Sequence, residues 1–226
     1  MLTINIITLF PELIEPYLER LPFSRAIEKG ALEVNLIQLK NYAIDERGTV
    51  DGRPYGGGVG MLLRIEPVWQ ALESVYGAFD NPEKIQADLE NTIIGLTPSG
   101  KTFTQKKAQE LSKKSTITLI CGRYEGMDAR IKQHLTTENI SIGNYVLSGG
   151  EIPALAIMEA VVRLLPEAIE KEEATLLESF SQGLDQKKEY PQFTRPETYK
   201  GLAVPEVLLS GHHEKIKKWQ KDQINS

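Results

Sequence analysis

Residues 141–153 have the sequence SIGNYVLSGGEIP, and this stretch decides how the rest of the chain is interpreted. It begins with strand-like residues, passes through Gly143, Gly149 and Gly150, and leads into the apolar run of residues 154–165. A tight, glycine-lined turn that feeds a helix lets a ligand approach backbone N–H groups closely. The stretch is therefore a candidate ligand-binding turn.

Two other polar turns are its expected companions. Residues 97–100 (TPSG) follow a strand expected over residues 92–96, and residues 122–126 (GRYEG) follow a strand expected over residues 116–121. In open parallel sheets, ligands bind outside the carboxyl ends of the strands. Because all three turns follow strand ends, we expect them to lie together around one site.

Alternating strand and helix patterns predict an α/β fold with a parallel sheet covered on both faces. Short runs rich in Ile, Val and Thr indicate the strands, and apolar residues at helical spacing indicate the helices. The expected strands are residues 3–9, 32–39, 92–96, 116–121 and 139–142. The main expected helices are residues 23–29, 65–76, 104–111, 128–134 and 152–165, with a further helical turn after Pro11.

The long polar stretch of residues 41–61 holds six of the 18 glycines. A loop of this length inside a compact domain is usually functional or disordered, and its charged and aromatic residues favour function. The run GGGVG at residues 56–60 lacks the Lys-Ser/Thr pair of a phosphate-binding P-loop and the spacing of a dinucleotide fingerprint. A flexible lid is the alternative interpretation of this run.

Composition narrows the class of protein. The chain has 226 residues, of which 41% are hydrophobic and 25% charged, as in ordinary globular proteins. It has no apolar run of 18 residues and no signal-peptide pattern at its start, so we expect a cytoplasmic protein without membrane association. The single Cys121 excludes an intrachain disulfide framework, and three histidines are too few for a confident metal site.

The C-terminal part differs from the rest in composition. Residues 166–177 are acidic and lack an apolar stripe, so we expect a mobile linker between a main domain of residues 1–165 and a small domain of residues 178–226. From Ser181 onward there are eight Lys and Arg against six Asp and Glu, although the whole chain has a net charge of −5. This asymmetry permits a polyanion contact at the C-terminal end, but a solvated charged face would give the same count.

The second turn carries three functional side chains between its two glycines. Arg123, Tyr124 and Glu125 place a cation, an aromatic ring and a carboxylate at one strand end, which favours a functional turn over a purely structural one. By pattern alone Arg163 is an isolated arginine on an apolar helix, which is usually a surface residue, and Glu178 is unremarkable.

Several blocks, in this order along essentially the whole chain, resemble the bacterial tRNA (guanine-N1)-methyltransferase family TrmD. They are ITLFPE at residues 7–12, VDGRPYGGGVGM at 50–61, CGRYEGMDAR at 121–130, SIGNYVLSGGE-PA at 141–154, TRP at 194–196 and VPEVLLSGHH at 204–213.

The resemblance implies a SPOUT fold with a deep trefoil knot in the C-terminal half of the α/β domain, plus a small helical C-terminal domain that binds tRNA. It implies S-adenosylmethionine as the methyl donor and N1 of guanine 37 of tRNA, next to the anticodon, as the acceptor. It further implies a homodimer with each active site shared between subunits, and Mg²⁺ in the activity.

Residue roles carried over from the family are expectations of the same kind. Catalysis is assigned to Glu178 as general base and to Arg163 as stabiliser of negative charge on O6. Substrate binding is assigned to Asp51, Arg53 and Tyr55. Cofactor binding is assigned to Leu96, Thr97, Pro98, Gly122, Tyr124, Glu125, Ile142, Gly143, Asn144, Tyr145, Val146, Leu147, Gly149, Gly150 and Pro153.

The sequence differs from the usual family residue at three positions in the regions that carry the resemblance. Glu178, Asn144 and Gly52 stand where the family usually has aspartate. Two alternatives therefore stay open: a tRNA-binding homologue with weakened or lost catalysis, and a SPOUT methyltransferase with another RNA target. A methylation assay separates them.

Overall fold

The computed structural model describes residues 1–81, 91–170, 175 and 178–224 of the chain. It divides into two compact units, Met1–Glu170 and Lys171–Ser226. Residues 171–174 and 176–177 of the expected mobile linker lie outside the described residues. The start of that expected linker belongs to the first unit, because Ala168 is buried there and Arg25 donates a hydrogen bond of 2.9 Å to the Glu167 carbonyl.

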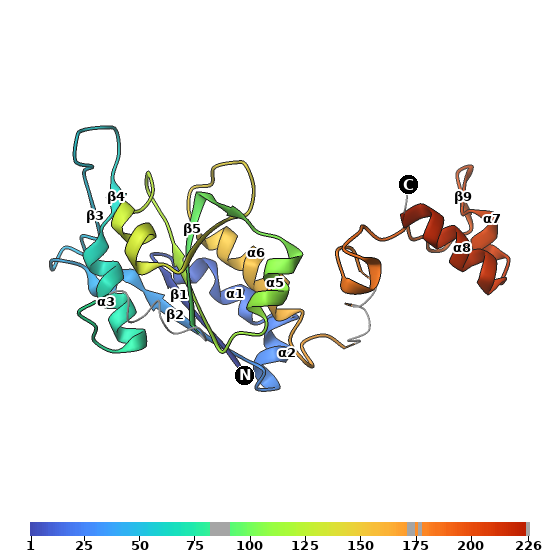
Figure 1. Ribbon diagram of the computed structural model, residues 1–226, viewed down its shortest axis with the longest axis horizontal. Helices are drawn as coiled ribbons and strands as arrows, with labels where there is room; N and C mark the ends of the chain where they lie inside the picture. The colour runs from blue at the N-terminus through green and yellow to red at the C-terminus, as the bar shows by residue number, and fades with distance from the viewer. Residues whose placement is uncertain (82–90, 171–174, 176–177, 225–226) are drawn as a thin grey trace. The chain divides into compact units, whose positions relative to one another are not determined.

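A parallel sheet of five strands forms the centre of the first unit (Figure 1), which confirms the predicted α/β class. Its order is β2-β1-β6-β5-β7, and each neighbouring pair is parallel. The strands are β1 (Leu2–Thr8), β2 (Leu32–Gln38), β5 (Asn91–Thr102), β6 (Thr116–Cys121) and β7 (Glu138–Ser141).

Helices cover both faces of this sheet. Side chains alternate along each strand, so that Ile4 and Ile6 of β1 face one hydrophobic cluster and Ile7 faces the other. The first face is covered by α1 (Glu15–Leu18), α2 (Phe23–Glu28), α5 (Gln105–Leu111) and α6 (Glu151–Val162). The second face is covered by α3 (Ile65–Tyr76) and the π-helical turn η3 (Ile131–Leu135), and Figure 1 shows α3 across the sheet from α5 and α6.

The first turn differs from the expectation. Residues 97–100 were expected to end the strand, but β5 continues through them to Thr102. The pairing of β5 with β7 shifts register between Leu96 and Lys101, so the polar residues form an irregularity inside the strand instead of a separate turn. Pro98 lacks an N–H for the ladder, which is why this segment pairs irregularly.

The long polar stretch contains more structure than the expected loop. It begins with the last residues of the short 3₁₀ helix η2 (Leu39–Tyr42) and includes one strand of an antiparallel hairpin made by β3 (Asp51–Gly52) and β4 (Leu62–Leu63). Figure 1 shows the connection between β3 and β4 projecting away from the sheet.

Two further helices differ in extent from their predictions. The helix expected over residues 152–165 is α6, which ends at Val162. Its last turn tightens, with Leu164 N–H bonded to the Val161 carbonyl, before Pro166 prevents continuation. The turn after Pro11 is split into a 3₁₀ helix, η1 (Pro11–Leu13), and α1.

The second unit is small and mostly exposed. It contains η5 (Gln182–Leu184), the hairpin β8 (Thr198–Tyr199) and β9 (Leu202–Ala203), α7 (Glu206–Leu209) and α8 (His213–Ile224). The hairpin was not predicted, although Lys200 and Gly201 both have the positive φ that a tight two-residue hairpin turn needs. Phe193 and Trp219 pack with ring centroids 6.3 Å apart.

A candidate ligand pocket formed by three glycine turns

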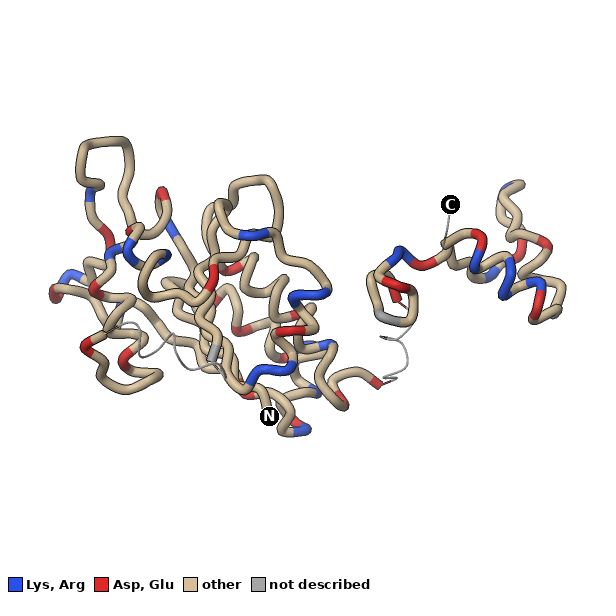
Figure 2. Tube along the Cα trace, viewed as in Figure 1, with Lys and Arg blue, Asp and Glu red and all other residues tan. Residues whose placement is uncertain are grey.

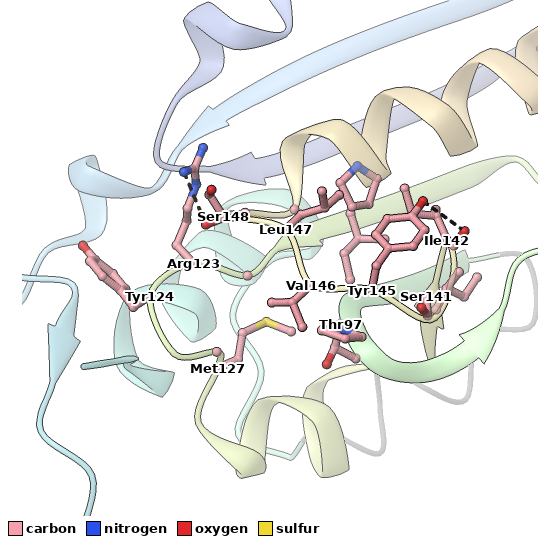
Figure 3. A pocket seen from close by; sticks show the side chains of 18 of the residues that line it. Thr97, Arg123, Tyr124, Met127, Ser141, Ile142, Tyr145, Val146, Leu147 and Ser148 are labelled. Atoms are coloured by element: carbon pink, nitrogen blue, oxygen red, sulfur yellow. Dashed lines mark hydrogen bonds between the residues drawn. The ribbon is translucent and has the colours of Figure 1, made fainter. Parts of the chain in front are cut away.

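The structure brings the three segments that were predicted to be turns together around one pocket in the first unit (Figure 3). They are the irregular segment of β5, the turn after β6, and the connection from β7 to α6. The pocket is lined by Leu96, Thr97, Pro98, Gly122, Arg123, Tyr124, Glu125, Gly126, Met127, Ile140, Ser141, Ile142, Gly143, Tyr145, Val146, Leu147, Ser148, Gly149, Gly150 and Pro153.

Local hydrogen bonds shape the beginning of the third turn. The Ser141 hydroxyl donates to the Gly143 carbonyl at 2.9 Å and accepts from the Gly143 N–H at 3.2 Å. The Tyr145 hydroxyl donates to the Ile142 carbonyl at 3.3 Å. The Tyr145 ring occupies the space in which a Cβ on residue 143 would lie, and Gly143 has a φ of +157°. Glycine at this position therefore lets the tyrosine fold back over the turn.

The end of the third turn crosses the end of β6 at van der Waals distance. The Gly150 N–H donates to the Gly122 carbonyl at 2.9 Å. A Cβ added at residue 150 would lie 2.6 Å from the Cα of Cys121 and 2.9 Å from the nitrogen of Gly122. Both neighbours are backbone atoms that cannot rotate away, so this crossing depends on glycine.

A partly buried ion pair lies beside this crossing. Nη2 of Arg123 lies 2.8 Å from Oε2 of Glu151, and Nε donates to Oε1 at 3.2 Å. The Glu151 side chain is 1% exposed, and its Oε1 also accepts a hydrogen bond of 2.7 Å from the Thr8 hydroxyl. The guanidinium lies 4.4 Å from the centre of the Phe10 ring, a favourable cation–π contact. Arg123 is therefore held between the Glu151 carboxylate and the Phe10 ring.

Cys121 lies at the same crossing and is buried. Burial is the main cause that raises the pKa of its thiol well above the usual range, and the negative charge of Glu151 raises it further. The thiol is consequently a packed, protonated group in the wall of the core.

The hairpin formed by β3 and β4 is attached to the second turn. The Glu125 N–H donates to the Met61 carbonyl at 3.0 Å, and the Leu63 N–H donates to the Gly126 carbonyl at 2.9 Å. The Glu125 side chain fills the space in which a Cβ on Gly60 would lie. The glycine-rich loop and the turn that lines the pocket are thus one connected structure.

Tyr124 has an unusual conformation in this turn. Its φ is +60°, a left-handed value that costs energy for a residue with a side chain. Figure 3 shows its ring pointing away from Met127 and Val146, so the residue lines the pocket while its ring is directed elsewhere. Partial burial raises the pKa of the Tyr124 hydroxyl, and the nearby charge of Asp51 raises it further.

The pocket favours a ligand that is largely apolar and carries positive charge. Of the residues that line it, two are formally charged, Arg123 and Glu125. The charge of Arg123 is balanced by Glu151, whereas Glu125 is exposed to solvent. Figure 3 shows Thr97, Met127 and Val146 directed toward one another in the apolar part of the pocket. Backbone groups of the glycines supply hydrogen-bonding partners.

Every residue that was predicted to bind the cofactor lines this pocket, with the exception of Asn144. Asn144 lies in the third turn and is exposed. The prediction omitted some lining residues, namely Arg123, Gly126, Met127, Ile140, Ser141 and Ser148. Arg123 was visible in the sequence as a cation at a strand end, but its partner Glu151 is 28 residues away and no short-range pattern connects them.

The residues predicted to bind substrate lie at the hairpin and do not line the pocket. Asp51 is half-buried in β3, near enough to Tyr124 to influence its pKa. Arg53 is exposed just after β3, and the Tyr55 side chain is fully exposed at the projecting end of the loop.

The two residues predicted to be catalytic lie in different units. Arg163 follows the last residue of α6 in the first unit, and its charge lowers the pKa of Glu159, although burial raises that pKa overall. Glu178 belongs to the second unit, where its carbonyl accepts a hydrogen bond of 3.0 Å from the Ser181 N–H. Neither residue lines the pocket.

Metal ligands are not grouped within the part of the chain that the structure describes. There, no three His, Cys, Asp or Glu side chains are placed so that they could hold one ion. In the same described residues, no helix is both long enough and apolar enough to cross a membrane.

Comparison with known proteins identifies the family. The family model described as tRNA (Guanine-1)-methyltransferase TrmD matches residues 2–226. A Bacillus pumilus protein named tRNA (guanine-N(1)-)-methyltransferase is 45% identical over 220 residues, which cover 97% of this chain and 86% of that protein. Proteins of the same name from Bacillus subtilis and Geobacillus kaustophilus are each 44% identical over 97% of this chain, and the alignments cover 86% and 85% of those proteins. The chain therefore belongs to the tRNA (Guanine-1)-methyltransferase TrmD family.

Proposed function

We propose that this protein transfers a methyl group from S-adenosylmethionine to N1 of guanine in tRNA, at position 37 beside the anticodon. The observation that supports this most directly is the pocket of three glycine turns, in a chain matched from residue 2 to 226 by the family model. The relatives from Bacillus pumilus and Bacillus subtilis are named for this activity, and their alignments cover 97% of the chain. An inactive tRNA-binding homologue is the less favoured alternative.

The pocket has the chemistry that S-adenosylmethionine requires. The molecule combines an apolar adenine ring, a ribose and a positively charged sulfonium, and when bound it supplies an electrophilic methyl group. Ile142 and Leu147 flank the ring in the proposal, and backbone groups of the three pocket segments bond to its polar edges. The exposed carboxylate of Glu125 complements the positive charge.

Methylation at N1 of guanine requires removal of the N1 proton and accommodation of negative charge that grows on O6. We assign the first task to the Glu178 carboxylate and the second to the Arg163 guanidinium. Glutamate is a carboxylate base like aspartate, although one methylene longer, and its reach must place an oxygen at hydrogen-bond distance from N1.

A homodimer with a shared active site fits the distribution of these residues. The pocket is lined by the first unit alone, whereas Glu178 belongs to the second. Large apolar side chains beside the pocket are exposed, including Val146 at 81% and Ile152 at 56%. Contiguous exposed apolar residues often mark a protein interface. In the proposal a second copy covers them and contributes to the site.

The trefoil knot is the finer part of the fold proposal. Two close backbone crossings support it: a Cβ at Gly100 would meet backbone atoms of Asn139 and Ile140 at 2.6 Å, and Gly150 approaches Cys121 as closely. Crossings of this kind are expected where a chain passes through its own loop.

For tRNA binding we assign Asp51, Arg53 and Tyr55 of the hairpin, together with the second unit, as a helical tRNA-binding domain. Figure 2 shows Lys and Arg along α8, which carries Lys215, Lys217, Lys218 and Lys221. Clustered cations of this kind bind the phosphate backbone of nucleic acids. We further propose that Mg²⁺ takes part in the activity and that the protein is cytoplasmic.

The decisive experiment is methylation of tRNA transcripts that carry guanine at position 37, with S-adenosylmethionine and Mg²⁺ and mapping of the product. We expect 1-methylguanine at position 37. No product would favour the inactive alternative if S-adenosylmethionine still binds, and a product at another nucleotide would identify a different RNA target.

The base assignment has its own variant. Glu178→Gln keeps the shape of the side chain but cannot accept the N1 proton, so kcat should fall by about 10²- to 10⁴-fold with the Kd of S-adenosylmethionine unchanged. Glu178→Asp should retain turnover. Glu170→Gln, the same substitution at an exposed residue in the first unit, is the matched control and should behave as wild type. Full activity of Glu178→Gln would refute the assignment.

A further inference from the structure

The ion pair of Arg123 and the buried Glu151 connects the two turns that supply most of the pocket wall. Arg123 belongs to the turn after β6, and Glu151 is the first residue of α6, directly after Gly149 and Gly150. Each residue is also fixed from behind, Glu151 by the Thr8 hydroxyl at 2.7 Å and Arg123 by the Phe10 ring at 4.4 Å. The turns are thus joined to each other and to the end of β1.

The pair also occupies the space beneath the third turn. A Cβ on Gly149 would meet both the Arg123 guanidinium and a carboxylate oxygen of Glu151. Nη1 of Arg123 donates a bond of 3.5 Å to the Ser148 carbonyl, as Figure 3 shows. The backbone of Ser148 and Gly149 therefore rests directly on the ion pair.

The contact between Oε2 of Glu151 and Nη2 of Arg123 is mainly electrostatic. Oε2 of Glu151 is buried and makes no hydrogen bond of acceptable geometry, although it lies 2.8 Å from Nη2 of Arg123. A carboxylate this buried is stable only when a cation compensates it. Neutralising either partner leaves the other as an uncompensated charge, which is more disruptive than removing both.

We propose that Arg123 and Glu151 are positioning residues for the methyl donor: their ion pair fixes the turn at Ser148–Gly150 against the turn at Gly122, and so preforms the pocket. They act through the backbone of the third turn and not by contact with the reacting atoms. The proposal rests on the proposed function only in its choice of S-adenosylmethionine as the ligand.

The first measurement needs no ligand. Hydrogen exchange of the peptide that covers residues 142–150 reports how firmly the third turn is anchored, because the Gly150 N–H is bonded to the Gly122 carbonyl. Glu151→Gln places an amide NH₂ toward Arg123, and Arg123→Met removes the cation while keeping much of the side-chain volume. Each should accelerate exchange in this peptide by about tenfold, with peptides of α5 unchanged.

The second measurement is the Kd of S-adenosylmethionine by calorimetry. Both single variants should weaken binding by about tenfold, and the double variant Arg123→Met/Glu151→Gln should bind no more weakly than the worse single variant. At saturating S-adenosylmethionine, kcat should recover toward the wild-type value, because the reacting residues are untouched.

Lys107→Met is the matched control. It removes the cation of another ion pair in the first unit, whose Nζ lies 3.0 Å from Glu138 and 3.0 Å from Glu110, and Lys107 does not line the pocket. Lys107→Met should leave the hydrogen exchange of residues 142–150 and the Kd of S-adenosylmethionine unchanged. This should hold even if it lowers the melting temperature as much as Glu151→Gln does.

The outcomes separate the two proposals. If wild type binds no S-adenosylmethionine, the proposed function fails, while the exchange measurement still decides whether the pair anchors the turn. If wild type binds and the Arg123 and Glu151 variants keep both wild-type exchange and wild-type Kd, the positioning role is refuted and the pair contributes only to stability.

Discussion

Replacing Gly150 by alanine tests the backbone crossing at which the pocket is built. Gly150 has an ordinary φ of −83°, so alanine could adopt its conformation without backbone strain. The cost comes from the neighbours: the added Cβ would lie 2.6 Å from the Cα of Cys121, 2.9 Å from the nitrogen of Gly122 and 3.0 Å from the carbonyl carbon of Cys121. All three are main-chain atoms, which must move apart as a whole segment.

The magnitude follows from two contributions. Inserting a carbon into a packed core costs about 1–3 kcal/mol. The displacement also lengthens the hydrogen bond from Gly150 to the Gly122 carbonyl, which is worth about 1 kcal/mol. We therefore expect the free energy of unfolding to fall by about 2–4 kcal/mol, and S-adenosylmethionine affinity to fall with it.

Gly52→Ala is the matched control. The three atoms nearest to its Cβ would all belong to the Arg64 side chain, at 3.5 Å or more, which is ordinary van der Waals distance. Both variants lose the same backbone freedom in the unfolded chain, so that contribution cancels in the comparison. Gly52→Ala should unfold within about 0.5 kcal/mol of wild type.

Urea denaturation followed by tryptophan fluorescence measures the difference. The chain has two tryptophans, and a Trp219→Phe background leaves Trp69 as reporter. Trp69 belongs to the first unit and stacks on Phe79 with centroids 4.5 Å apart. With a slope of about 2 kcal/mol/M, the midpoint of Gly150→Ala should fall by about 1–2 M. Equal midpoints for the two alanine variants would refute the crossing argument.

Two further predictions concern the flanks of the pocket. Thr104→Ala removes the hydroxyl that accepts the Lys107 N–H at the start of α5, and thermal unfolding should show a loss of about 1 kcal/mol relative to wild type. The hydrogen bonds from Arg130 lower the pKa of Asp128, so this pair stabilises the fold above the ordinary carboxyl pKa and loses its effect as pH falls through the lowered value. Arg130→Met should remove this part of the acid dependence in urea titrations between pH 2 and about 5, and an unchanged pH profile would contradict it.

The sheet could be predicted closely from the sequence because its strands are short runs of buried Ile, Leu, Val and Thr between clear breaks. The predicted strand at residues 116–121 has the observed bounds of β6. Strand order was not accessible, since β6 lies between β1 and β5 through pairings that no local pattern records. The segment TPSG was predicted to be a turn after the strand, but Pro and Gly also occur at irregularities inside a strand.

The candidate pocket could be predicted as a meeting of three turns, because parallel strands place their carboxyl ends at one edge. The side-chain contacts that hold the turns of the pocket in place could not be predicted. The Arg123–Glu151 pair joins residues from two turns, and Thr8 and Phe10 join it from the end of β1, more than 100 residues earlier. Such contacts depend on tertiary packing, which residue types and spacing do not reveal.

The central place of β6 has a consequence for how this protein is made. β1 can pair with β2 once about the first 40 residues have left the ribosome, but its other edge must wait for β6, whose partners lie 113 residues further along, as for Asn5 and Thr118. Until then β1 presents an unpaired edge of backbone N–H and C=O groups between two apolar faces, the kind of surface on which nascent chains associate wrongly. Completion of the sheet, and with it the pocket, therefore comes only after most of the first unit has been synthesised.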